Sequence, residues 1–123
     1  MKNYFLLILI FFNINLVAQT MYPTDYFGLP MDIPLLVSGT FGELRENHLH
    51  SGIDFKTQKL EGFPVMATAD GYVSRIKVSL FGFGKVVYIT HPNGYTTVYA
   101  HLQKFSPEIE NYVKGEQYKN QQF

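Results

Sequence analysis

The stretch that decides the fold is Lys85–His101, which reads Lys-Val-Val-Tyr-Ile-Thr-His-Pro-Asn-Gly-Tyr-Thr-Thr-Val-Tyr-Ala-His. β-Branched and aromatic residues fill both halves of this stretch, and such residues are typical of strands. Asn93-Gly94 in its middle is the preferred pair for a two-residue type I′ turn. The sequence therefore predicts a β-hairpin.

A two-residue turn also determines which side chains of this hairpin share a face. Ile89 then lies opposite Val98 on an aliphatic face, which we expect to pack against the core. The other face carries Tyr88, Tyr99 and His101. We expect that face to hold the functional site, and we expect His91 to be a solvated histidine beside the turn.

Turn residues divide the rest of the chain into further short elements. Strands are expected at residues 37–41, 64–68 and 72–78. A short helix is expected near residues 107–114, because Ser106 can cap it and Pro107 suits its first turn. Its buried stripe is expected to be Ile109, Tyr112 and Val113. The predicted fold class is all-β, an antiparallel sheet with one short helix near its end.

The amino-terminal segment has the pattern of an export signal. Lys2 precedes an apolar run that ends near Ala18, which is typical of a secretory signal peptide over residues 1–18. A transmembrane anchor is the alternative, but Asn13 and Asn15 interrupt a run already shorter than the roughly 20 residues that span a bilayer. We expect an exported protein of the periplasm or cell envelope, or a secreted one, without a stable membrane anchor after cleavage.

Composition excludes several classes of function. The chain has no cysteine, which excludes disulfides and thiol chemistry. Its 10 basic and 10 acidic residues leave no basic footprint, so nucleic acid is not an expected partner. Residues 19–36 contain three prolines among apolar residues, and we expect an extended arm there. Removal of residues 1–18 leaves 105 residues, which is long enough for one small domain, and we expect that domain to occupy residues 37–123.

A candidate metal site lies in Arg45–Phe55, where His50 and Asp54 stand four residues apart around Gly52. Imidazole and carboxylate both bind Zn²⁺, and a catalytic zinc has three protein ligands and one open position. A helix is disfavoured by the glycine, and a fully extended strand would separate the two Cα atoms by roughly 13 Å. The backbone must bend, and Gly52 can supply a bend through a positive φ. The alternative is a surface histidine beside a turn aspartate.

A third candidate is His101, at the end of the second hairpin strand. A histidine there can be a third ligand or a proton carrier, and the alternative is a histidine bonded to backbone. Spacing alone assembles His50, Asp54 and His101 as three zinc ligands. His48 is expected to be an accessory or surface group.

Four motifs in order resemble one known family. They are Gly39-Thr40-Phe41-Gly42-Glu43-Leu44-Arg45, His50-x-Gly-Ile-Asp54, Pro64-Val65-x-Ala67-x-Ala69-Asp70-Gly71-x-Val73 and Gly94-Tyr95-x-Thr97-x-Tyr99-Ala100-His101-Leu102. Together they look like the lysostaphin-type zinc metallopeptidases, or LytM-domain proteins. The resemblance spans residues 37 to about 115, and the arm is similar to that of exported members from Bacteroidetes-like bacteria.

The resemblance implies a zinc enzyme of the duplicated-hybrid-motif type, with a groove in an antiparallel sheet. Such enzymes hydrolyse peptide cross-bridges or stems of peptidoglycan, so peptidoglycan peptides are the expected partner and Zn²⁺ the expected cofactor. The family's ligand pair maps onto His50 and Asp54, and His101 becomes a catalytic group rather than a ligand. We expect Tyr88 and Tyr99 to wall the groove, with core packing as the alternative.

The family's third ligand is the second histidine of a downstream His-x-His, which the resemblance places beyond Phe123. We therefore expect residues 37–123 to be the front part of a peptidase domain, inactive or nearly so alone. The alternative function is a non-catalytic LytM-like module that binds peptidoglycan or activates another hydrolase. A third reading is an exported β-domain without zinc. The peptide bond that is cut and the oligomeric state are not indicated by the sequence.

Overall fold

The computed structural model describes residues 22–121 and is built mainly of strands. In chain order the elements are β1 (Val37–Gly39), β2 (Asp54–Phe55), β3 (Tyr72–Val78), β4 (Lys85–Thr90), β5 (Thr96–Tyr99) and α2 (Pro107–Asn120). The expected signal peptide lies outside the described residues. For the described residues, the all-β class with one helix near the end is confirmed.

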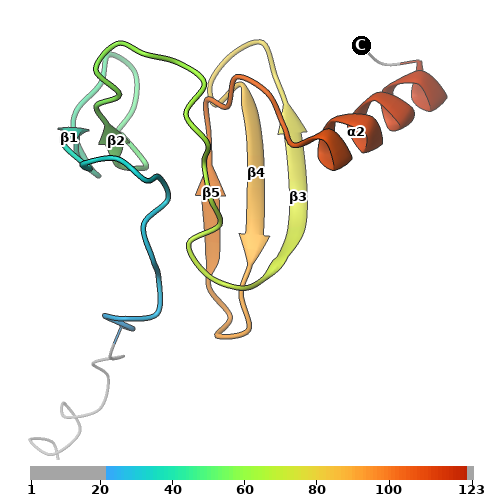
Figure 1. Ribbon diagram of the computed structural model, residues 1–123. Coiled ribbons are helices and arrows are strands. Elements are labelled where there is room, and N and C mark those ends of the chain that lie inside the picture. The colour runs from blue at the N-terminus through green and yellow to red at the C-terminus, as the bar shows by residue number, and fades with distance from the viewer. Residues whose placement is uncertain (1–21, 122–123) are drawn as a thin grey trace, which may run out of the picture.

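The strands form two separate antiparallel sheets. β1 pairs with β2 in a small sheet, and β3, β4 and β5 form a three-stranded sheet in the order β3-β4-β5. Figure 1 shows the small sheet at the upper left, the larger sheet in the centre and α2 beyond β3 at the right. The strand expected at residues 37–41 forms as β1 and ends two residues earlier than expected. The strand expected at residues 72–78 forms as β3 with the expected bounds.

The β4–β5 hairpin forms as expected, but its turn differs from the predicted one. His91 pairs with Tyr95 across a three-residue loop, through bonds from His91 N to Tyr95 O (2.9 Å) and from Gly94 N to His91 O (2.9 Å). Gly94 takes φ +85°. A type I turn followed by a left-handed glycine is a common alternative to the two-residue turn. The predicted turn type is therefore wrong.

The longer loop shifts the hairpin register by one residue. Val87 lies opposite Tyr99, and Tyr88 lies opposite Val98. Because side chains alternate across a strand, a one-residue shift moves one strand's side chains to the other face. Tyr99 thus shares a face with Val87, and Tyr88 lies on the opposite face. The expectation that the two tyrosines share one face is wrong.

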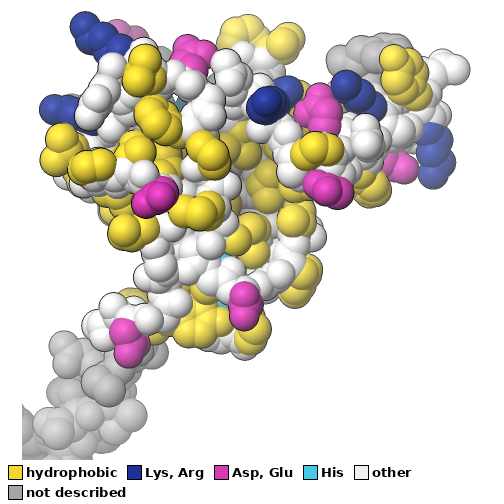
Figure 2. Space-filling view, viewed as in Figure 1, with side chains coloured by type: hydrophobic (Ala, Val, Ile, Leu, Met, Phe, Trp, Pro, Cys, Tyr) yellow, Lys and Arg dark blue, Asp and Glu magenta, His cyan; other side chains and the backbone are white. Residues whose placement is uncertain are grey.

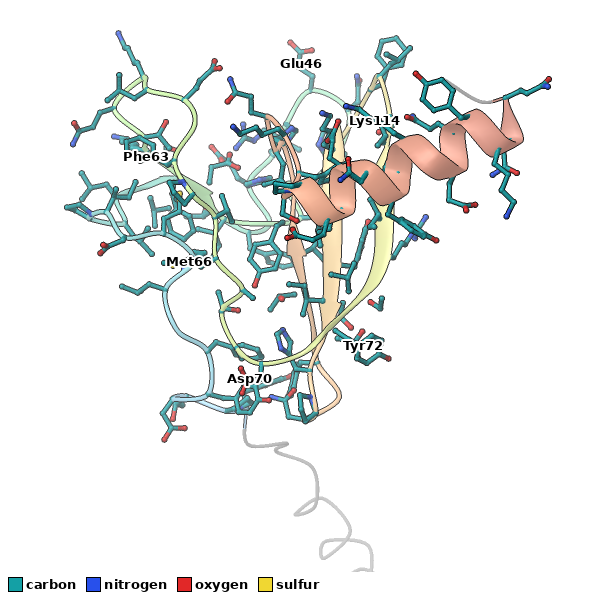
Figure 3. All side chains as sticks on the ribbon, turned by 45° about the vertical axis from the view of Figure 1, so that its right-hand side comes forward. Glu46, Phe63, Met66, Asp70, Tyr72 and Lys114 are labelled. Carbon is teal, nitrogen blue, oxygen red and sulfur yellow. The ribbon has the colours of Figure 1, made fainter. Side chains whose placement is uncertain are left out.

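Residues 22–36 form neither helix nor strand and run antiparallel to the segment before β3. Gly28 N donates to Thr68 O (2.6 Å), and Met66 N donates to Pro30 O (2.8 Å). The strand expected at residues 64–68 is absent, because these two bonds are too few to build a ladder. In Figure 3, Phe63 and Met66 lie on this segment, which continues through Asp70 to the start of β3 at Tyr72.

Helix α2 begins where the sequence predicts and extends six residues past the predicted end. Ser106 caps it by accepting a bond from Ile109 N (3.5 Å), and Pro107 stands at its start. Good helix formers continue it past Gly115. The predicted buried stripe is wrong, since no residue of α2 is buried and Tyr112 is 63% exposed.

The core within residues 22–121 is small. Its buried apolar side chains are Met31, Val86, Val87 and Phe105. His91 is buried with them at 3% exposure, so the expected solvated histidine is wrong. Figure 2 shows hydrophobic side chains over much of the visible surface, whereas charged side chains gather over α2 at the right. Among the described residues no helix is both long and apolar enough to cross a membrane.

The buried ring of His91 has partners from three parts of the chain. Its Nδ1 lies 2.8 Å from the carbonyl of Asp70, and its Nε2 lies 2.8 Å from Thr97 Oγ1. The ring also packs edge-on against Phe27 of the arm at 5.2 Å. A buried polar ring with both nitrogens bonded incurs little desolvation penalty. His91 therefore ties the arm and the segment before β3 to the hairpin.

Candidate functional site

His50, one of the two candidate metal ligands, is carried by a small hairpin that the sequence did not predict. Residues 42–45 pair with residues 48–50 through three backbone bonds: Gly42 N to His50 O (2.7 Å), His50 N to Glu43 O (2.8 Å) and Arg45 N to His48 O (2.9 Å). Leu44 and Leu49 form an antiparallel bridge within it. Gly42, at φ +78°, allows the chain to enter this hairpin. The side chain of His50 is thereby fixed on a short backbone ladder.

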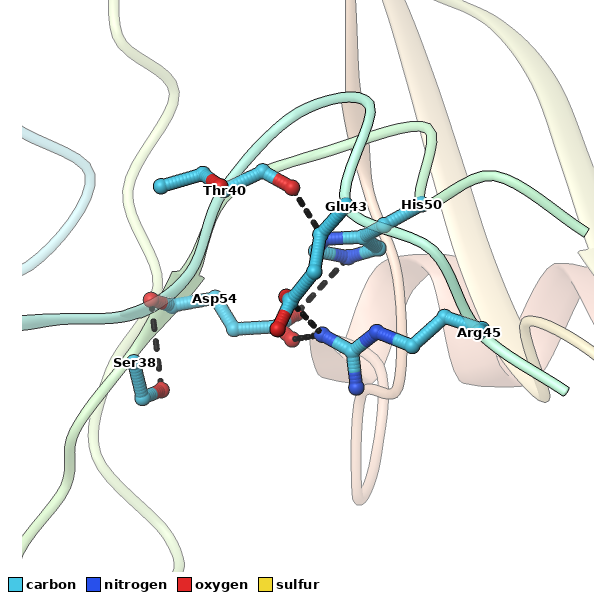
Figure 4. A network of polar contacts seen from close by, with 6 residues as sticks. All are labelled: Ser38, Thr40, Glu43, Arg45, His50 and Asp54. Atoms are coloured by element: carbon cyan, nitrogen blue, oxygen red, sulfur yellow. Dashed lines mark hydrogen bonds and ion pairs between the residues drawn. The ribbon is translucent and has the colours of Figure 1, made fainter.

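A bend at Gly52 brings His50 and Asp54 together, as expected. His50 Nε2 lies 3.1 Å from Asp54 Oδ1 (Figure 4). Asp54 begins β2 and pairs with Gly39 of β1, so backbone pairing holds the second side chain as well. The expected mechanism of the bend is wrong, because Gly52 is not among the residues with positive φ.

The hydrogen bond of His50 to Thr40 determines which ring nitrogen is protonated. His50 Nδ1 lies 3.0 Å from the carbonyl oxygen of Thr40, which can only accept. Nδ1 therefore carries the proton in the neutral ring, and Nε2 presents a lone pair. Such a bond to the second nitrogen is the usual way in which a metal-binding imidazole is oriented.

The facing atoms form a pair that attracts a cation. A lone pair on His50 Nε2 and an ionised oxygen of Asp54 repel each other unless a proton or a metal ion lies beside them. Their separation of 3.1 Å is close to the distance of about 3.4 Å between two ligand atoms on a tetrahedral zinc. The donor types and their spacing therefore fit zinc.

Within residues 22–121 no group of three His, Cys, Asp or Glu side chains is arranged to hold a metal ion. His101 does not complete the pair, so the three-ligand set expected from spacing alone is not formed. His50 and Asp54 are the two predicted ligands that the fold brings together.

The second oxygen of Asp54 has a partner that sequence reasoning missed. Arg45 Nη2 donates to Asp54 Oδ2 (2.8 Å) and to Glu43 Oε2 (2.9 Å), as Figure 4 shows. Gly39 leaves room for this pair, since a Cβ there would stand 2.5 Å from both Arg45 Nη2 and Asp54 Oδ2. Glu43 and Arg45 were visible only as members of the first motif, with no separation in sequence that pointed to Asp54.

His101 lies at the end of β5 in an unusual backbone conformation. Its φ is +56°, which is uncommon for a residue with a side chain. Its N–H donates to Phe83 O (2.9 Å), and its ring meets that of Phe83 edge-on at 6.3 Å. The imidazole is exposed. Backbone strain of this kind often occurs at functional sites.

His101 lines a hollow of about 850 Å³ on one face of the larger sheet. Apolar side chains of residues 60–67, of the larger sheet and of the stretch that leads from β5 into α2 form most of its wall, among them Phe63, Val65, Met66, Val87, Phe105 and Ile109. Tyr99 also lines the hollow, whereas Tyr88 does not. His50 and Asp54 are not among its lining residues.

The two tyrosines have different surroundings. The Tyr99 hydroxyl bonds with Thr68 N (2.9 Å), Thr68 Oγ1 (3.0 Å) and Thr97 Oγ1 (3.0 Å), so it fixes the segment before β3 against β5. The guanidinium of Arg75 lies over the ring of Tyr88, with Arg75 Cζ 5.3 Å from the ring centre. For Tyr99, these contacts favour the packing role over the role of a groove wall.

The sequence profile of peptidase family M23 matches residues 48–118, a span that contains His50, Asp54 and His101. This chain belongs to peptidase family M23. The lysostaphin-type family indicated by the four motifs is thereby confirmed. No solved structure matches the M23 chain.

Relatives with curated names agree with M23 membership. The chain is 45% identical over 67 residues to the DD-carboxypeptidase/endopeptidase Mpg of Neisseria meningitidis, a match that covers 54% of this chain and 15% of that protein. It is 42% identical over 55 residues to an uncharacterised metalloprotease of Haemophilus influenzae, covering 45% of this chain and 11% of that protein. It is 29% identical over 82 residues to the cell division protein DipM of Caulobacter vibrioides, covering 66% and 13%. The match thus spans about 15% of the length of the first relatives.

Proposed function

We propose that this M23 chain contributes to a zinc metallo-endopeptidase that hydrolyses peptide cross-bridges or stems of peptidoglycan. The observation that supports it most directly is the approach of His50 Nε2 to Asp54 Oδ1 at 3.1 Å, with His50 Nδ1 bonded to Thr40. A histidine oriented in this way beside a carboxylate is the start of a zinc site.

The substrate class is argued from the relatives and from the hollow. One relative is named as a carboxypeptidase/endopeptidase and another as a cell division protein. The hollow beside His101 is large enough for several residues of a peptide, and its apolar wall suits small aliphatic side chains. Peptidoglycan peptides, reached after export to the periplasm or cell envelope, are the proposed partner.

Each residue has a distinct role in this proposal. His50 and Asp54 hold the zinc, which when bound polarises a peptide carbonyl and acidifies a water molecule. His101 exchanges a proton with the reacting peptide group, for which its exposed imidazole is accessible. Tyr99 supports the wall of the hollow through its bonds to Thr68. Tyr88, on the other face of the sheet, is proposed to contact substrate only outside the hollow.

The experiment is zinc binding and peptide release by the protein expressed from its complete coding sequence. His50→Ala is expected to lose the zinc, whereas His48→Ala, an exposed histidine two residues away, is expected to keep it. His101→Ala is expected to keep the zinc and to lose release of peptides from purified peptidoglycan, measured by mass spectrometry. Equal zinc content in the His50 and His48 variants would contradict the ligand assignment.

A second candidate is a non-catalytic module that binds peptidoglycan or activates another hydrolase. It is supported by the relative that is named as a cell division protein, a name that states no hydrolase activity. Sedimentation with purified peptidoglycan separates the two. Binding without peptide release, unchanged in His101→Ala, would favour the module over the enzyme.

A further inference from the structure

We propose that Arg45 is a positioning residue that holds Asp54 so that one carboxylate oxygen alone faces the zinc position. The inference rests on the proposed zinc site and concerns how its carboxylate ligand is oriented. It assigns a role to the first motif of the chain, Gly39–Arg45, which contains neither of the two proposed metal ligands.

The two oxygens of Asp54 have different partners. Oδ2 accepts a bond from Arg45 Nη2 at 2.8 Å, and Oδ1 lies 3.1 Å from His50 Nε2. A carboxylate without such a partner can rotate and offer both oxygens or neither. With Oδ2 engaged, Oδ1 stays on the side of His50, which reduces the ordering required when a metal ion binds.

The backbone delivers Arg45 and His50 as one unit. Both residues lie on the small hairpin, where His50 N bonds to Glu43 O and Arg45 N bonds to His48 O. A movement of the hairpin therefore carries the guanidinium and the imidazole together. Asp54 lies on β2 and meets both, so the network joins the hairpin to the small sheet.

These contacts have little reason to exist for folding alone. The side chains of Arg45, Asp54 and Glu43 are 39%, 42% and 45% exposed. Ion pairs at such exposure are screened by water and contribute little to stability. Gly39 nonetheless leaves free the space that the pair occupies, since a Cβ at that position would stand 2.5 Å from both charged ends. Space kept free for a pair that adds little to stability points to orientation of Asp54 as its role.

If Arg45 competed with the metal ion for Asp54, its removal would change zinc affinity in the opposite direction. Arg45 as a competitor would occupy Asp54 in place of the metal ion, and its removal would then strengthen zinc binding. Arg45 as a positioning residue makes removal weaken it. Partners that orient metal ligands typically change metal affinity by about 10- to 100-fold when they are removed.

The test measures zinc affinity of the complete protein by competition with a chromophoric chelator. Arg45→Ala is expected to bind zinc about 10-fold more weakly. Arg45→Lys is expected to recover most of the affinity, because one nitrogen, Nη2, makes both contacts and an ammonium can replace it. Arg75→Ala, which removes the other arginine of the chain from its place over Tyr88, is the matched control and is expected to leave affinity unchanged.

A spectroscopic measurement distinguishes positioning from a general loss of structure. The visible absorption of the Co²⁺-loaded protein reports coordination geometry, so Arg45→Ala is expected to change the band shape at saturating metal, whereas Arg45→Lys is not. Thermal unfolding of the metal-free variants is expected to match that of Arg75→Ala within about 0.5 kcal/mol, which is a change of about 2-fold in the equilibrium constant.

His50→Ala separates failure of this inference from failure of the proposed function. Loss of zinc in His50→Ala with unchanged or tighter binding in Arg45→Ala overturns the positioning role and leaves the zinc site standing. Undetectable zinc binding in the unaltered protein, or unchanged binding in His50→Ala, overturns the zinc site and the inference with it.

Discussion

The two sheets of this protein differ in what holds them together. The larger sheet has strands of seven, six and four residues and contains the buried Val86 and Val87. The small sheet has strands of three and two residues with a bulge, and its neighbourhood is stabilised by polar contacts at Asp54. The candidate ligands thus lie where there is least core. Changes in the larger sheet should lower stability, and changes beside Asp54 should lower metal affinity.

The largest expected effect is on stability, from shortening a side chain of the larger sheet. Val86 is fully buried, so Val86→Ala leaves a cavity and is expected to lower the unfolding free energy by about 2 kcal/mol. Val78→Ala is the matched control, because Val78 is 47% exposed and loses little contact. Urea denaturation measures both. Equal losses in the two variants would contradict the core assigned to this sheet.

A smaller loss is expected from the hydroxyl that joins the segment before β3 to the hairpin. Tyr99→Phe removes the partner of Thr68 N, Thr68 Oγ1 and Thr97 Oγ1, and should lower the unfolding free energy by about 1.5 kcal/mol. Tyr88→Phe is expected to change it by less than about 0.5 kcal/mol, because the Tyr88 hydroxyl makes no hydrogen bond within residues 22–121. The two-residue turn would have given both tyrosines one face, so similar results for the pair would support that register instead.

Beside Asp54 the expected effect moves from stability to metal affinity. Gly39→Ala places a Cβ 2.5 Å from Arg45 Nη2 and Asp54 Oδ2, and should weaken zinc binding about 10-fold, or 1.4 kcal/mol. Unfolding of the metal-free protein should change little, since the displaced side-chain ends are partly exposed. Chelator competition gives the affinity.

Gly52→Ala is the matched control for that substitution. A Cβ there makes only an ordinary contact, 3.9 Å from His50 Nε2, and the residue does not need a positive φ. Its zinc affinity is expected to stay within about 2-fold of the unaltered protein, a difference below 0.5 kcal/mol. If Gly52→Ala lost more zinc affinity than Gly39→Ala, the bend at Gly52, rather than the space beside Asp54, would be what zinc binding requires.

The smallest expected effect is a gain, in helix α2. Gly115 lies within α2 with open space around its Cβ position, so Gly115→Ala should raise the unfolding free energy by about 0.5–1 kcal/mol. Gly94→Ala has the same open space but φ +85°, and should lower stability by about 1 kcal/mol. Thermal unfolding of the pair checks both signs, and zinc affinity should not change in either.

Local patterns predicted most of the elements and few of the contacts. The bounds of β3, the hairpin and the start of α2 followed from strand formers, turn residues and the cap at Ser106. The hairpin register did not follow, because Asn93-Gly94 is compatible with two-residue and three-residue loops that differ little in local energy. The burial of His91 depends on Asp70, Thr97 and Phe27, which no local pattern links to it.

The candidate site divides in the same way. The His50 and Asp54 pair could be found from its spacing and its glycine, and the order of the four motifs indicated the family. Arg45 could not be assigned to Asp54, because their contact depends on an unpredicted hairpin and on the pairing of β2 with β1. The place of His101 in a hollow without His50 also depends on how the two sheets are arranged.

By itself the sequence determined the family, the class of fold and the candidate ligand pair, because residue types at short spacing specify local chemistry and strand formation. Tertiary structure alone decided the hairpin register, the faces of Tyr88 and Tyr99, the burial of His91 and the engagement of Asp54 by Arg45. Each of those features depends on a free-energy difference of about one or two kcal/mol between alternatives that are locally almost equal. They are resolved only when segments distant in the chain bring their side chains into contact.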